Sequence, residues 1–106
     1  MSDIFYIKRG DTSPRLVYKL FPDVNLTGAS AVFNMRKKGA ANTVNRGAAT
    51  VVAPATGGTL SYPWAPADTA TEGQFEAEFE VTYADLTVET YPNNGFITVR
   101  IKNDLG

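Results

Sequence analysis

Three glutamates at alternate positions come closest to a catalytic set in this chain. Glu76, Glu78 and Glu80 alternate with apolar residues, so a strand would present them on one face, about 6 to 7 Å apart. Carboxylates at such separations serve glycoside hydrolysis or bind a hard cation. A glycosidase pair, however, usually comes from different strands that face a cleft. We therefore interpret the row as a solvated strand face opposite basic residues on a neighbouring strand, because surface charges are weak evidence of function.

The residue types that the chain lacks exclude most other catalytic sites. The 106 residues include no histidine and no cysteine, which excludes His-based triads, thiol nucleophiles and the common zinc sites. No glycine-rich phosphate loop of known pattern is present. Asp68, Glu72 and Asp85 could contribute to a calcium loop, but no DxDxDG pattern accompanies them, and capping or turn roles suit them better. We predict that the protein is not an enzyme and uses no cofactor or metal.

Two short basic clusters indicate a further possibility, a platform for single-stranded nucleic acid. Basic residues at 8–9 and 36–38 lie near Tyr6 and Phe33, and cations interleaved with aromatic rings are typical of such platforms. The whole chain has ten basic and eleven acidic side chains, a net charge of -1, whereas phosphate-binding proteins need a basic excess. We therefore expect no nucleic-acid or membrane partner and interpret the clusters as charged strand ends that discourage aggregation.

Aromatic residues in the second half of the chain could form a platform for sugar. They are Tyr62, Trp64, Phe75, Tyr83 and Tyr91. A small sandwich needs about this many aromatic side chains for its core, so core packing is the interpretation that we favour. A carbohydrate-binding module stays as an alternative.

Strands must position these residues, because apolar side chains recur with a period of two in most of the sequence. The clearest case is 74–83, where five apolar residues share one face. Further strands are expected at 4–8, 15–21, 29–36, 59–64, 88–91 and 96–102, with a weak strand at 50–52 between mobile loops. Seven or eight short strands, about ten residues apart and with no convincing helix, favour one antiparallel sandwich or barrel over 1–106.

The connections carry their own signals. Gly10, Gly28, Gly73 and Gly95 are placed at turns. Pro63 cannot donate a ladder hydrogen bond, so we expect it at an edge or a strand end. The connection 66–73 has room for one helical turn capped by Asp68 or Thr69.

Three segments, taken in order, resemble a known family. They are FYIKRGDT at 5–12, LTGASAVFNMR at 26–36, and a set running from LSYPW at 60–64 through DT at 68–69 and GQFEAEFEV at 73–81 to YPN at 91–93. Together they resemble the immunoglobulin-like N-terminal domain of the upper baseplate proteins of tailed bacteriophages. The resemblance implies an immunoglobulin-like β-sandwich with Phe33, Trp64, Phe75 and Phe79 in its core. It implies no catalytic residues.

The resemblance also implies a structural role in a virion, after synthesis in the host cytoplasm. In that family the domain docks onto the baseplate or tail, and a following region binds the host. This sequence stops at Gly106 without such a region, so we expect an excised domain or a small adaptor. The expected partners are copies of the chain itself or neighbouring virion proteins. A head decoration or head-fibre protein, and a carbohydrate-binding module for host-surface recognition, are the alternatives.

An edge strand is a plausible means of contact, because its unpaired backbone groups can extend a partner's sheet. The candidate contact residues lie in and just after the N-terminal strand. They are Phe5, Tyr6, Lys8 and Arg9, and the region 40–56 is a second candidate surface.

Overall fold

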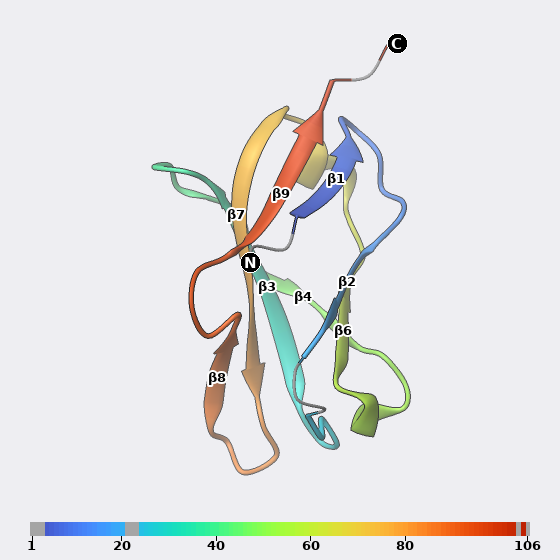
Figure 1. Ribbon diagram of the computed structural model, residues 1–106, viewed down its shortest axis with the longest axis vertical. Coiled ribbons are helices and arrows are strands. Elements are labelled where there is room, and N and C mark those ends of the chain that lie inside the picture. Colours follow the sequence, from blue (N-terminus) through green and yellow to red (C-terminus); the bar gives the residue numbers. More distant parts are fainter. Residues whose placement is uncertain (1–3, 21–23, 104, 106) are drawn as a thin grey trace.

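The computed structural model describes residues 4–20, 24–103 and 105, and it is built from strands (Figure 1). Nine strands are described: β1 (Ile4–Lys8), β2 (Leu16–Lys19), β3 (Ser30–Lys37), β4 (Asn42–Ala48), β5 (Thr50–Val51), β6 (Thr59–Tyr62), β7 (Gly73–Thr82), β8 (Val88–Tyr91) and β9 (Ile97–Lys102). Two short 3₁₀ turns, η1 (Ala55–Gly57) and η2 (Pro66–Thr69), lie in the connections. Neither of these helical segments has the length that crossing a bilayer requires.

The strands form two sheets. The larger has the order β1-β9-β7-β3-β4, and the smaller has the order β2-β6-β5. β3 pairs with β7 over the full length of β3, from Ser30 opposite Thr82 to Lys37 opposite Phe75. The other side of β7 is shared, because β9 pairs with its first half and β8 with its second half (Figure 1).

One edge of the larger sheet departs from the antiparallel arrangement that the sequence predicts. β1 pairs with β9 in parallel, with Ile4 opposite Thr98 and Lys8 opposite Lys102. No short connection joins these strands, since they come from opposite ends of the chain, and hairpin geometry therefore does not fix their relative direction. The fold is all-β with a mixed larger sheet.

β4 is the strand that the sequence analysis missed. The segment before 50 was expected to be a loop, but residues 42–48 pair with β3. Only Val44 is buried on this strand, and two register shifts interrupt the pairing. Without a run of alternating apolar residues the pattern carried no strand signal. The other predicted strands are present; the end of the 15–21 prediction lies outside the described residues.

The two sheets pack against each other through aromatic side chains. Phe33 of β3 stacks on Tyr62 of β6 with ring centroids 4.4 Å apart, and it meets Trp64 edge to face at 5.7 Å. The ring of Tyr18 on β2 stacks on that of Phe79 on β7, with centroids 5.9 Å apart. The four predicted core residues are all buried. Each fully buried Phe contributes about 1.5–3 kcal/mol relative to an exposed one.

The connection after β6 contains the single helical turn that its sequence predicts. β6 ends at Tyr62, which confirms Pro63 as a strand-end residue. The Asp68 carboxylate in η2 accepts hydrogen bonds from the Ala65 N–H at 2.8 Å and from the Tyr62 hydroxyl at 2.7 Å. Burial and this carboxylate raise the pKa of Tyr62. The fully buried Thr69 donates to the Asp11 carbonyl at 2.9 Å, which holds the loop that leads into β2.

Candidate functional site

The predicted contact residues lie on β1, an edge strand of the larger sheet. The alternation of the strand divides them between two faces. Phe5 is partly buried and its ring lies 5.8 Å from that of Trp64, whereas Tyr6 is 58% exposed. Lys8 and Arg9 lie where β1 ends beside β9: Lys8 Nζ donates to the Asn103 carbonyl, and the Arg9 N–H donates to the Lys102 carbonyl. The four residues are therefore neighbours along the chain but form no single patch.

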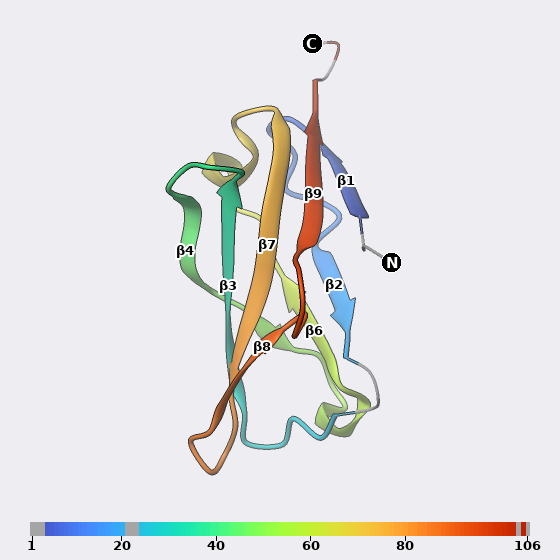
Figure 2. The same ribbon diagram turned by 60° about the vertical axis from the view of Figure 1, so that its left-hand side comes forward.

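A groove runs between β1 and β2, the edge strands of two different sheets. We call it the β1–β2 groove, and its volume is about 470 Å³. The side chains that dominate its walls are Ile4, Phe5, Val17, Tyr18, Tyr91 and Pro92. Figure 2 shows β1 and β2 on one flank of the molecule and β4 on the other. The groove includes Phe5 from the predicted set and adds residues that the prediction did not name.

Val17 is the main residue that sequence reasoning missed here. It is 58% exposed, and Ile4 across the groove is 49% exposed. The signal was available, because Leu16, Tyr18 and Leu20 define the inward face of the strand and Val17 occupies the phase that should be polar. Val17 and Ile4 together therefore give this flank of the molecule exposed apolar surface.

Basic residues outnumber acidic ones in β1, β2 and the loop between them. Described residues 4–20 hold Lys8, Arg9, Arg15 and Lys19 against the single acidic residue Asp11. Lys19 lines the groove itself, and the Arg15 guanidinium donates to the Ser61 hydroxyl at 3.2 Å. The groove therefore combines apolar walls with one basic side chain, that of Lys19.

Hydrogen bonds around Glu89 brace one end of the groove. The Tyr83 and Tyr91 hydroxyls both donate to Glu89 Oε1, at 2.9 and 2.7 Å, and Asn93 Nδ2 donates to Oε2 at 3.0 Å. The bonds from the two tyrosines are the largest causes that lower the pKa of Glu89. Burial raises the pKa of both tyrosines. Tyr91 and Asn93 also line the groove, so this network fixes part of its wall.

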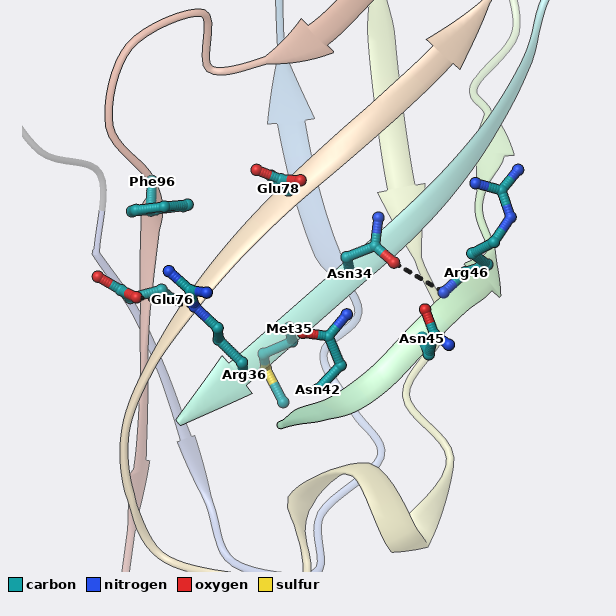
Figure 3. Close-up of a pocket in the computed structure, with 9 residues that line it drawn as sticks. All are labelled: Asn34, Met35, Arg36, Asn42, Asn45, Arg46, Glu76, Glu78 and Phe96. Carbon is teal, nitrogen blue, oxygen red and sulfur yellow. Dashed lines mark hydrogen bonds and ion pairs between the residues drawn. The ribbon is translucent and has the colours of Figure 1, made fainter. Parts of the chain in front are cut away.

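The second predicted surface, 40–56, contributes to a different hollow, on the outer face of the larger sheet. We call it the asparagine pocket after Asn34 of β3 and Asn42 and Asn45 of β4 (Figure 3). Its volume is also about 470 Å³. The remaining lining residues are Met35, Arg36, Arg46, Glu76, Glu78 and Phe96.

The glutamate row lies beside this pocket and faces basic side chains, as predicted. Arg36 Nε lies 3.1 Å from Glu76 Oε1, and an Arg46 guanidinium nitrogen lies 3.0 Å from Glu80 Oε1. The acidic residues among those that line the pocket both come from β7. Within the described lining, therefore, no carboxylate faces the row from another strand, and the glycosidase arrangement is not formed.

The aromatic set forms core and not a platform. Tyr62, Trp64, Phe75 and Tyr91 are buried, and Tyr83 is half-buried. The core interpretation is confirmed. The described acidic residues include no group of three close enough to hold a metal ion.

The comparisons with known proteins gave a single finding. No curated protein and no solved structure matches the chain. A family model, the BppU N-terminal domain, matches residues 21–92, which is more than half of the chain and includes β3 to β8. This match confirms the resemblance seen in the sequence. The chain belongs to the BppU N-terminal domain family, which consists of structural domains of the bacteriophage baseplate.

Proposed function

We propose that this chain is a non-enzymatic structural protein of the virion, in the baseplate or tail, and that it binds a neighbouring virion protein through the β1–β2 groove. The two packed sheets, with β1 beside β9, then act as an immunoglobulin-like sandwich that presents one flank to its partner. Family membership supports the virion role, and the groove supports the mode of contact.

The observation that carries the proposal is an apolar groove between two strand edges. β1 and β2 each end a sheet, so each has backbone N–H and C=O groups on its outer side that no described strand pairs. A partner segment in extended conformation can hydrogen-bond to such an edge while its side chains enter the groove. Exposed Ile4 and Val17 would be covered by that segment.

Charge favours a neighbouring protein over a symmetric pair of copies. Two β2 strands paired about a two-fold axis would bring Arg15 and Lys19 of both copies to one edge, and like charges there are unfavourable. A partner segment with apolar and acidic residues would suit the same edge. A melting temperature that does not change with protein concentration is therefore expected for the isolated chain. A strong dependence would favour self-association instead.

The test uses a phage whose copy of the gene is deleted and replaced by variants. Val17→Asp places a charge in the groove, and we expect the variant chain to be absent from purified virions. Val88→Asp on β8 is the matched control, since Val88 is a valine with the same 58% exposure. It should be incorporated normally. Melting curves of both variants establish that they fold.

Two results would contradict the proposal. Incorporation of Val17→Asp at the wild-type level would exclude the groove as the contact. Absence of the wild-type chain from virions would exclude the virion role. Gold labelling of wild-type virions gives the position: label at the tail tip is expected, and label over the head would favour a decoration or head-fibre protein.

A further inference from the structure

The asparagine pocket is shaped by an irregular strand. Opposite Phe33 and Met35, two residues apart on β3, the partners on β4 are Gly47 and Val44, three residues apart. The next step adds another extra residue on β4, since Met35 and Arg36 face Val44 and Asn42. β-bulges of this kind change the direction of side chains and are over-represented beside functional sites.

The bulges direct polar side chains to one face. In a regular strand Asn42 would share the inward face of Val44, yet Val44 is buried and Asn42 lines the pocket together with Asn45 and Arg46. Arg46 has a φ of 54°, which is uncommon for any residue other than glycine. The Asn34 side-chain oxygen accepts the Arg46 N–H at 2.8 Å and holds this conformation (Figure 3).

Ion pairs hold the two arginines beside the pocket. Arg36 is held by Glu76 and also lies over the Phe96 ring, 5.4 Å from its centroid. Arg46 extends from β4 across β3 to Glu80 of β7. Figure 3 shows Phe96 at one side of the pocket and Arg46 at the other. Both arginines are neutralised by a carboxylate, so the pocket offers no unpaired positive charge to a phosphate.

The groups left without partners are amides and one carboxylate. In the described part of the chain the side chains of Asn42, Asn45 and Glu78 make no hydrogen bond, and Asn34 uses only its oxygen. Amides both donate and accept, and a carboxylate accepts from two oxygens. Neighbouring hydroxyl groups on a ring match this set, since each hydroxyl also donates and accepts. The 39% exposed Phe96 ring adds an apolar surface for the C–H face of such a ring.

We infer that the asparagine pocket binds a neutral sugar, through Asn42, Asn45 and Glu78. Its volume of about 470 Å³ lies within the roughly 300–1,000 Å³ of small-molecule sites. This site is separate from the β1–β2 groove and does not depend on the partner proposed for it. It differs from the aromatic platform considered in the sequence, because its recognition groups are two amides on the bulged strand β4 and the Glu78 carboxylate on β7.

The experiment is an NMR titration of the ¹⁵N-labelled whole chain with the methyl glycosides of glucose, galactose, rhamnose and N-acetylglucosamine. At least one is expected to shift the side-chain amides of Asn42 and Asn45 and to saturate at millimolar concentration. Asn45→Ala and Glu78→Gln should each weaken that binding about tenfold, the loss expected for a hydrogen bond that involves a charged or amide group. Gln74→Ala, on the outer face of the same strand as Glu78 but outside the pocket, should bind like the wild type.

Three results would contradict a sugar site in this pocket. Absence of shifts at the pocket with all four glycosides would overturn the inference, as would unchanged binding in Glu78→Gln, which alters no bulge residue. Inorganic phosphate is expected to cause no shift there. Phosphate that binds and displaces the sugar would make this an anion site and would also overturn it. All these measurements use the isolated chain, so they are independent of incorporation into virions.

Discussion

The β1–β2 groove and the asparagine pocket have the same volume but different chemistry. Each measures about 470 Å³, but the β1–β2 groove has apolar walls and the asparagine pocket is polar. The groove exists because two sheets end beside each other, whereas the pocket exists because one strand carries extra residues. A groove along strand edges suits an extended chain, and a local hollow on a sheet face suits a small ligand. In each case the backbone feature that makes the hollow also limits what can bind there.

The largest expected effect comes from the core that supports both hollows. Phe33 is fully buried and packs on Tyr62 and Trp64, so Phe33→Ala should lower the free energy of unfolding by about 3–5 kcal/mol. That is a large share of the roughly 5–15 kcal/mol of a typical domain. Urea denaturation measures the loss. Phe96→Ala, which removes a partly exposed ring, is the control, and equal losses in the two variants would contradict this picture of the core.

A smaller effect should separate the two regions. A Cβ at Gly47 would lie 2.8 Å from Val44 Cγ1 and 2.9 Å from Tyr62 Cε1. Gly47→Ala should therefore cost about 1–3 kcal/mol through overpacking and should disturb β4 first. Hydrogen exchange is expected to accelerate in β4 and to stay unchanged in β1 and β2.

Gly57→Ala is the matched control for that substitution. Its new Cβ would meet only Pro54 Cγ, at the ordinary distance of 3.9 Å, so we expect wild-type exchange rates throughout. If Gly47→Ala accelerated exchange equally in both regions, the pocket and the groove would have to be treated as one cooperative unit.

The smallest effect concerns the Glu89 network at the end of the groove. Because the folded-state pKa of Glu89 is below its ordinary 4.5, the carboxylate stabilises the fold above pH 4.5, and this contribution is lost as the pH falls below that value. The raised pKa of Tyr91 gives the opposite dependence, with stability lost as the pH rises above about 10. Tyr91→Phe should cost at most about 1 kcal/mol at neutral pH and should flatten both slopes.

Unfolding free energies measured from pH 3 to 11 test this prediction. Tyr6→Phe removes an exposed hydroxyl on β1 and should leave the profile unchanged. Identical acid slopes in the wild type and Tyr91→Phe would show that Glu89 gains nothing from Tyr91.

The sequence predicted the regular parts of this fold, each from a local pattern of residues. Five alternating apolar residues predicted strand β7 and its buried face. Asp68, in a turn that begins with a proline, predicted the capping hydrogen bond of η2. Three segments in order gave the family resemblance that the match at 21–92 confirms. These features depend on short-range patterns, which a single sequence displays.

The parts that the sequence did not predict depend on long-range pairing. The direction of β1 is set by β9, more than ninety positions away. The bulges of β4 are visible only in its register with β3. The β1–β2 groove is made by residues from both ends of the chain. Phe5 could be named from its strand and Val17 from its phase, but their proximity to Pro92 could not be predicted.

The most direct test of the account places a photo-crosslinking amino acid at position 17 of the chain in assembled virions. Irradiation is predicted to join the chain to one neighbouring virion protein, identified by mass spectrometry. The same amino acid at position 88, where the valine is equally exposed, is predicted to give no such product. Crosslinking from position 88 but not from position 17, in virions that contain the chain, would contradict the claim that the β1–β2 groove is the contact surface.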